Sequence, residues 1–176
     1  MVQTARKKAA GSAMYLLLLG LMAGAFIAFA AEGSNMAAHS LLAHPETYGL
    51  GKCLAGAIFG TGLMMVVVAG AELFTGNTMM IMGVMSKEIS WSAMLRNWLL
   101  VYAGNFAGSA ALAWAMNYSG LLGSGGGLLG GMTVKIALGK VHLSFGQALV
   151  LGILCNILVC AAVWMAAGAK DITGKI

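Results

Sequence analysis

The feature that most constrains this chain is an apolar run from Cys53 to Ser86 that contains a single charged residue, Glu72. One helix over the whole run would be roughly 50 Å long at about 1.5 Å per residue, but the hydrocarbon core of a bilayer is only about 30 Å thick. Two full spans do not fit either, because the part after Glu72 is too short to cross. The run therefore predicts one helix that is broken at membrane depth.

The predicted break covers residues 70–77, with the sequence Gly-Ala-Glu-Leu-Phe-Thr-Gly-Asn. Non-helical backbone at membrane depth is tolerated only where protein buries it or where it lines a watery cavity, and transporters build their pathways from such broken helices. An ionisable side chain within a span is a functional-site hypothesis by default. We therefore expect non-helical backbone from Leu73 to Asn77, with Thr75 facing a cavity. The alternative is a single kinked span with a slack end.

The composition is that of a membrane protein. The 176 residues are 60% hydrophobic and 9% charged, whereas charged residues make up roughly 25% of soluble domains. Glycine pairs at Gly-x-x-x-Gly spacing, beginning at Gly20, Gly56 and Gly104, predict close helix packing. The sequence predicts an all-α polytopic protein with one transmembrane domain over 1–176, whose spans cover approximately 10–31, 53–86, 97–118 and 145–167.

The basic residues predict the orientation. Those at 6–8 precede the uncharged run 9–31, which is longer than the core of a signal peptide, about 7–15 residues, although the A-x-A triplet at 28–30 resembles a cleavage site. We therefore prefer a first span with its basic end in the cytoplasm. We expect an external loop over 32–52, with or without a short surface helix, and a second over 120–131. Both termini are then in the cytoplasm, which places seven of the ten lysines and arginines inside.

The break contributes four candidate pathway residues. Leu73 and Phe74 can close a pore as an apolar constriction, and Thr75 and Asn77 can hydrogen-bond an ion or the loosened backbone. The alternative is that Leu73 and Phe74 pack in an ordinary core and that Thr75 caps the second half-helix.

Two further candidates belong to the fourth span. Lys140 lies at its external mouth, and Asn156 lies deeper on the same helix. A cation at a pore mouth concentrates anions, although a lysine that snorkels to the interface is the simpler reading. An asparagine among apolar residues is costly in lipid unless it has a partner, so Asn156 should face the bundle interior.

Nothing in the sequence predicts a metal, a cofactor or an enzyme. The three cysteines form no C-x-x-C pair, and the three histidines fall in connecting segments without ligand spacing. No set of nucleophile, base and orienting residue is visible, and no phosphate loop. No basic patch is interleaved with aromatic residues, so we expect no nucleic-acid partner.

Residues 19–24 of the first span resemble residues 151–156 of the fourth. The two spans lie three apart and run in opposite directions, which is the relation that an inverted repeat of three spans produces. Chance similarity between apolar helices is the alternative.

Three stretches resemble the formate/nitrite transporter family: Met22 to Phe26, Ala71 to Asn77, and Gly152 to Trp164. The resemblance extends over essentially the whole chain. It implies an aquaporin-like fold of six spans in two inverted repeats, homopentamers with a pore in each protomer, and a place in a bacterial-type inner membrane. It also implies transport of small monovalent anions of weak acids such as formate, nitrite, hydrosulfide, acetate or lactate, with no cofactor.

The resemblance assigns roles to individual residues. Leu73, Phe74 and Thr75 match the family's constriction loop, Lys140 matches the lysine that attracts the anion, and Asn156 matches the asparagine that partners a central histidine. That histidine belongs to an F-E-H-S segment of a second broken helix, which this sequence does not contain. We therefore expect one full three-span repeat plus the first span of the second, as in an N-terminal fragment or a truncated product.

The expected mechanism is passive or proton-coupled transport without ATP. A bare anion pays a large desolvation cost in an apolar constriction, and the same desolvation raises the pKa of the acid, so that the ion can cross in neutral form after taking a proton. The competing hypotheses are a non-conducting membrane scaffold that co-assembles with other chains and a small membrane enzyme.

Overall fold

The computed structural model describes residues 1–176 and contains only helices, turns and loops. The α-helices are α1 (Val2–Ala9), α2 (Ala13–Ala43), α3 (Tyr48–Ala69), α4 (Phe74–Asn77), α5 (Ile81–Met85), α6 (Trp91–Tyr118), α7 (Leu128–Val141) and α8 (Phe145–Gly168). Four helical segments are long and apolar enough to cross a membrane, namely Ala13–Ala43, Pro45–Ala69, Trp91–Tyr118 and Phe145–Gly168. The all-α, polytopic part of the predicted fold class is therefore confirmed.

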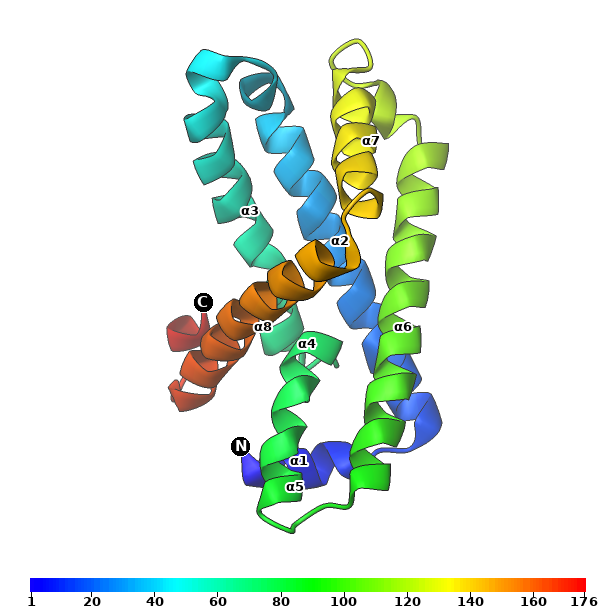
Figure 1. The fold of residues 1–176 in the computed structure, drawn as a ribbon, viewed down its shortest axis with the longest axis vertical. Coiled ribbons are helices and arrows are strands. Elements are labelled where there is room, and N and C mark those ends of the chain that lie inside the picture. Colours follow the sequence, from blue (N-terminus) through cyan, green and yellow to red (C-terminus); the bar gives the residue numbers. More distant parts are fainter.

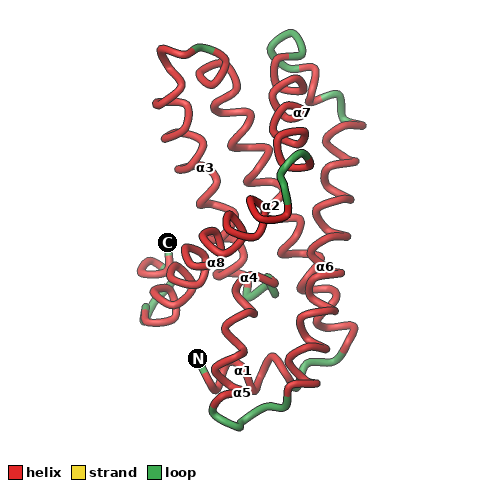
Figure 2. Tube along the Cα trace, in the orientation of Figure 1, coloured by secondary structure: helices red, strands yellow, loops and turns green.

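Helix α2 is the centre of the bundle, with α3 packed on one side and α6 on the other (Figures 1 and 2). Its contact with α6 is made by backbone: a Cβ at Gly24 would collide with the backbone of Asn105, and a Cβ at Gly108 would collide with the backbone of α2. Helices in lipid associate through such close approach. The glycine pairs of α2 and α6 thus pack as predicted, whereas Gly56 and Gly60 of α3 have no such neighbour within 4 Å.

The first span is longer than predicted. Helix α2 continues through much of the expected loop 32–52 as far as Ala43, and α3 begins at Tyr48. The loop prediction is therefore wrong, and the reason lies in a tertiary contact. Glu32 is buried and accepts a hydrogen bond from Thr133 of α7, so this polar stretch is stable as a helix.

Helix α6 also begins earlier than the expected span 97–118. The Ser90 side chain caps it by accepting a hydrogen bond from the Ala93 N–H at 3.2 Å, and serine is a preferred residue at this position. Arg96, expected in the connection before the span, is therefore helical, and its guanidinium donates to the carbonyl of Gly11 at 3.0 Å.

The second span is broken in the structure, but the non-helical part is shorter than the predicted segment 70–77. Helix α3 ends at Ala69, Gly70 has a φ of 68°, and the chain stays non-helical as far as Leu73. Glycine adopts this left-handed conformation without a steric penalty. The expectation of non-helical backbone is wrong for residues 74–77, which form the single turn α4.

Part of the glycine-rich segment 120–131, which the sequence predicts to be a loop, is helical. Glycines 125–127 have φ values of 62°, 67° and 87° and turn the chain into α7 at Leu128. Helix α7 then runs from the upper end of the bundle back toward its middle (Figure 1). A capping box at Ser144 starts α8, which covers the expected span 145–167.

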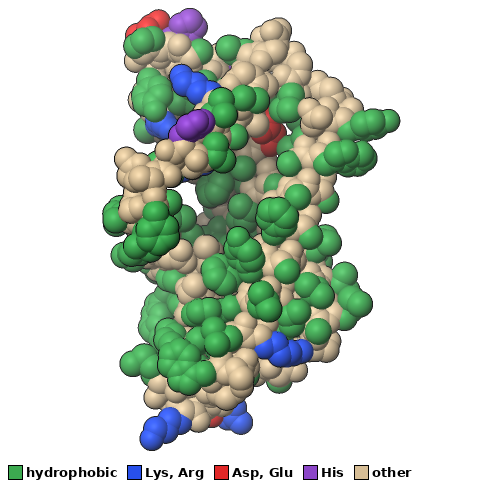
Figure 3. Space-filling view, turned by 45° about the vertical axis from the view of Figure 1, so that its right-hand side comes forward, with side chains coloured by type: hydrophobic (Ala, Val, Ile, Leu, Met, Phe, Trp, Pro, Cys, Tyr) green, Lys and Arg blue, Asp and Glu red, His purple; other side chains and the backbone are tan.

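The surface agrees with a membrane environment. Figure 3 shows one face, on which hydrophobic side chains cover the middle while lysine and arginine side chains lie toward the two ends. Helix α8 is the most exposed of the long helices: it packs mainly against α4, and none of its residues is buried.

The close contact between α2 and α6 can be tested with alanine. Gly108→Ala should lower the free energy of unfolding by about 1–3 kcal/mol, because overpacking has this cost and the obstacle here is backbone. Gly60→Ala is the matched control, since a Cβ there meets nothing within 4 Å. Thermal unfolding in detergent micelles measures both, and equal midpoints for the two variants would contradict the packing described here.

Candidate functional site: the break between α3 and α4

The broken backbone is held by one side chain of α6. The Asn105 Oδ1 accepts from the Phe74 N–H at 2.9 Å, and its Nδ2 lies 2.9 Å from the Glu72 carbonyl and 2.8 Å from the Gly20 carbonyl. The Glu72 N–H donates to the Leu19 carbonyl of α2 at 3.2 Å. Because no water is available in hydrocarbon, such groups must find partners within the protein. The break is therefore a fixed structural element.

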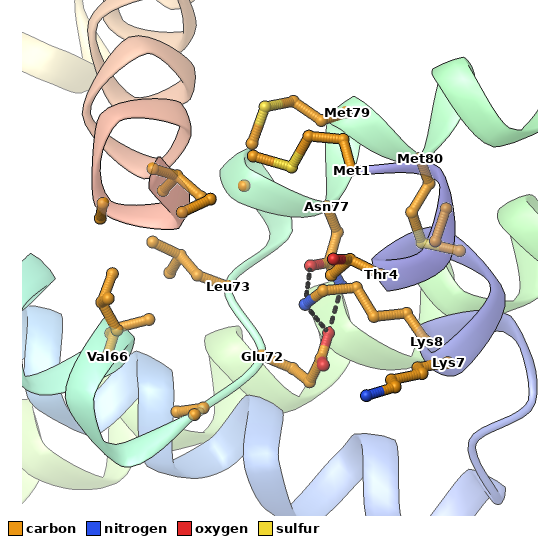
Figure 4. A pocket seen from close by; sticks show the side chains of 18 of the residues that line it. Met1, Thr4, Lys7, Lys8, Val66, Glu72, Leu73, Asn77, Met79 and Met80 are labelled. Atoms are coloured by element: carbon orange, nitrogen blue, oxygen red, sulfur yellow. Dashed lines mark hydrogen bonds and ion pairs between the residues drawn. The ribbon is translucent and has the colours of Figure 1, made fainter. Parts of the chain in front are cut away.

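A buried polar network lies beside the break (Figure 4). The Lys8 Nζ is 2.7 Å from the Glu72 Oε2 and 2.8 Å from the Asn77 Oδ1. The Asn77 Nδ2 donates to the same Glu72 oxygen at 2.6 Å and to the Asn97 Oδ1 at 2.8 Å. A buried carboxylate is costly unless it is paired and hydrogen-bonded, and Glu72 has both kinds of partner.

The sequence alone does not predict this role of Lys8, which counts there only among the basic residues that orient the chain. The signal that points to it is the lone carboxylate of Glu72 in an uncharged run, since such a charge requires a partner. The sequence offers no spacing that selects Lys8 over Arg6 or Lys7. Only the fold, which places α1 under the break, makes that choice (Figure 1).

A cavity of about 390 Å³ opens beside this network. Among the candidate pathway residues, Leu73 and Asn77 line it, and Figure 4 shows Leu73 on the side that faces Val66. Lys7, Lys8 and Lys175 contribute cations to the same cavity. The lining of the cavity thus combines apolar side chains with three cations and the buried carboxylate of Glu72.

Phe74 and Thr75 do not line this cavity. The Phe74 ring packs edge-on against Trp98 and Tyr102, with centroid distances of 6.0 and 5.4 Å. The Thr75 Oγ1 is buried and has no hydrogen-bond partner. The expectation that Thr75 faces a cavity is therefore not met by the cavity described here.

Helix α8 closes the other side of α4. The Cys160 thiol lies 3.5 Å from the Thr75 carbonyl and 3.4 Å from the Thr78 Oγ1. Asn156, one turn earlier on α8, donates to the Gly152 carbonyl at 3.0 Å, while its Oδ1 is buried without a partner. Two unsatisfied polar atoms, a hydroxyl and an amide oxygen, thus belong to the two elements that meet at this contact.

Lys140 lies apart from the break. It is exposed in the last turn of α7, and its side chain forms no ion pair or hydrogen bond in the structure. Lys135 is exposed on the same helix. The structure thus brings four of the six candidates together around α4 and places Asn156 on the adjoining helix, with Lys140 remote from both.

The comparisons with known proteins bear on this arrangement. A sequence model of the formate/nitrite transporter family matches residues 1–176. The chain belongs to this family. It is 43% identical over 163 residues to the formate channel BtFdhC of Bacillus thuringiensis. This alignment covers 92% of the present chain and 61% of BtFdhC. It is 37% identical over 172 residues to the formate channel FocA of Haemophilus influenzae. This alignment covers 98% of the present chain and 60% of FocA.

A solved structure shares the fold. A pentameric formate channel with formate bound superposes with a TM-score of 0.81 at 38% identity, over 93% of this chain and 63% of that one. The predicted fold class and family are thereby confirmed, and the chain is an integral membrane protein. It spans about three fifths of the length of the relatives it matches.

The Lys8 network should contribute strongly to stability. Lys8→Met leaves Glu72 buried without a cation and should lower the free energy of unfolding by about 3–5 kcal/mol. The double variant Lys8→Met/Glu72→Gln should recover most of this loss, because the stranded charge is gone. Unfolding in detergent micelles measures both variants.

Arg6→Met is the control. Arg6 pairs with Glu88 at 3.4 Å, but both side chains are largely exposed, at 64% and 43%, and such pairs contribute about 0–1 kcal/mol. If Arg6→Met lowered the free energy of unfolding as much as Lys8→Met, the buried network would contribute no more to stability than an exposed ion pair.

Proposed function

We propose that the protein conducts small monovalent anions of weak acids, formate in the first place, across the membrane through each protomer of a homopentamer. Membership of the family supports this proposal, as do relatives named as formate channels and the fold shared with a pentameric formate channel. The observation that carries it is local. The Thr75 Oγ1 and the Asn156 Oδ1 are the buried side-chain polar atoms left without partners, and they flank the contact between α4 and α8.

The two unpaired atoms have the hydrogen-bonding roles that a neutral carboxylic acid requires of its partners. The Thr75 hydroxyl can donate to the acid's carbonyl oxygen, and the Asn156 Oδ1 can accept from the acid's O–H. Leu73, which lines the neighbouring cavity, adds an apolar side chain whose surroundings are costly for a bare anion. In such surroundings the pKa of the acid rises, so we propose that the ion crosses this level after taking a proton. The family's central histidine is the partner that the resemblance assigns to Asn156.

Lys140 is proposed to act before this point. Its ammonium group is exposed and unpaired, so its charge is free to raise the local concentration of anions. Transport then needs no ATP, and the anion's own gradient, with or without a proton, drives the flux. Nitrite, hydrosulfide and short-chain carboxylates share the small size and weak acidity that this mechanism requires.

The orientation we propose places both termini in the cytoplasm of a cell with a bacterial-type inner membrane. Arg6 pairs with Glu88 and Arg96 contacts Gly11, so the basic residues of α1, of the 86–90 turn and of α6 gather at one end of the bundle. Residues from both chain ends, including Met1 and Lys175, line one cavity. A cluster of basic residues at one end is the cytoplasmic signature.

A non-conducting scaffold is the second candidate. The exposed surface of α8 supports it, since a helix without buried residues can take up further helices by co-assembly. Transport and scaffolding differ in one measurement, the uptake of formate by proteoliposomes.

The first test of the pathway concerns Lys140. Lys140→Ala should slow formate uptake, and more at low than at high ionic strength, because salt screens a mouth charge over about 8 Å at physiological strength. Lys140→Arg should keep most of the rate, since attraction requires charge more than geometry. Lys135→Ala is the control on the same helix. Parental uptake by Lys140→Ala at every salt concentration, or an equal loss in Lys135→Ala, would leave snorkelling as the role of Lys140.

The second test concerns Thr75. Thr75→Val should slow formate uptake about tenfold, which corresponds to about 1.4 kcal/mol in the barrier, without lowering the unfolding midpoint. The midpoint is spared because the hydroxyl has no partner to lose. Thr61→Val is the control, since Thr61 is exposed on α3 and bonds only its own helix. A lower midpoint with unchanged uptake would assign Thr75 to packing.

A further inference from the structure

A second buried carboxylate lies far from the Lys8 network and has no cationic partner. Glu32 of α2 is 7% exposed and forms no ion pair in the structure. The Asn35 Nδ2 donates to its Oε2 at 3.1 Å, and the Thr133 hydroxyl of α7 lies 3.3 Å from both carboxylate oxygens. The Asn35 Nδ2 also reaches the Thr133 Oγ1 at 3.4 Å. The proposed transport mechanism makes no use of this cluster.

The cluster is the polar attachment of α7 to the bundle. Helix α7 packs against α2, and Leu129, its one buried residue, is 0% exposed. Thr133 follows one turn later and makes the only side-chain hydrogen bonds from α7 to another helix. Leu129 and Thr133 therefore define the face of α7 that turns toward α2.

Lys140 lies on that same face. At 3.6 residues per turn, Lys140 is rotated by only about 20° from Thr133 and by about 20° from Leu129. Lys135 is rotated by about 160° from Thr133, so it lies on the opposite face. The contact that attaches α7 to α2 therefore also sets which way Lys140 points.

We infer that Glu32 is a positioning residue for transport: by accepting from Thr133 and Asn35 it fixes the rotation and depth of α7 and so holds Lys140 at the mouth of the pathway. A buried carboxylate is costly without hydrogen bonds, so a rotation of α7 that removes the Thr133 hydroxyl is opposed. A single buried leucine would not define the rotation in this way. The inference rests on the proposed role of Lys140.

Formate uptake by proteoliposomes containing the full-length protein tests the inference across a series of salt and formate concentrations. Lys140→Ala sets the reference, a loss of roughly fivefold at low salt, which is the concentration factor of a unit charge about 4 Å away in water. Glu32→Ala and Thr133→Val should show the same flattened salt dependence and a raised KM, with the maximal rate little changed. Adding Lys140→Ala to Glu32→Ala should have no further effect.

Two conservative variants serve as controls. Glu32→Gln should keep the parental salt dependence, because its amide oxygen still accepts from Thr133. Glu46→Gln removes the same charge from an exposed side chain beyond the end of α2 and should change nothing. If Glu32→Gln and Glu32→Ala raise uptake alike, the carboxylate acts by repelling the anion, and the inference is wrong.

Hydrogen exchange of the α7 amides, residues 128–141, gives a readout that does not depend on transport. These amides should exchange faster in Glu32→Ala and Thr133→Val than in the parent and in Glu32→Gln, while α6 stays unchanged. Faster exchange in a protein that takes up no formate would support the attachment and refute the proposed function. Parental exchange in both variants, or losses that multiply in the double variant, would overturn the inference. If Glu32→Ala does not assemble, the exchange and uptake of Thr133→Val alone test the inference.

Discussion

The structure depends on one constraint: a helix that breaks at membrane depth must satisfy its free backbone groups inside the protein. Asn105 does this for both sides of the break by binding the Phe74 N–H and the Glu72 carbonyl. It reaches them only because α6 lies in backbone contact with α2, and Gly24 and Gly108 make that contact sterically possible. The break therefore depends on Asn105, and Asn105 reaches the break only through the packing that Gly24 and Gly108 allow.

The position of the break also determines where the N-terminal helix lies. Glu72 lies in the non-helical segment, and its carboxylate requires a cation that cannot come from solvent. Lys8 supplies this charge from α1, which lies across the lower end of the bundle (Figure 1). The carbonyl of Lys8 in turn accepts from Asn97 of α6 at 3.2 Å. A short amphipathic segment thus becomes part of the wall of the cavity beside the break.

The sequence predicted what depends on bilayer thickness and local pattern, and it failed where distant residues decide. The length of the 53–86 run favoured a broken helix over a single kinked span whatever the rest of the fold. The start of α4 at Phe74 was not predictable, because the N–H of this first residue is bound by Asn105, 31 positions away. The loop expected over 32–52 failed for the same reason, since Thr133 lies 101 positions from Glu32. The family resemblance named Thr75 and Asn156 but not their unsatisfied state.

That unsatisfied state bears on which ions the proposed pathway accepts. The Thr75 hydroxyl can donate a hydrogen bond to an anion. The Asn156 Oδ1 can only accept a hydrogen bond, and a deprotonated acid has no hydrogen to donate to it. A protonated weak acid supplies an O–H, so its neutral form can satisfy both buried atoms, whereas its anion can satisfy only the Thr75 hydroxyl. The anion of a strong acid has no accessible neutral form at physiological pH and leaves the Asn156 oxygen unpaired. Under the proposed function, the buried contact between α4 and α8 would select for weak acidity, while the exposed Lys140 would select only for negative charge.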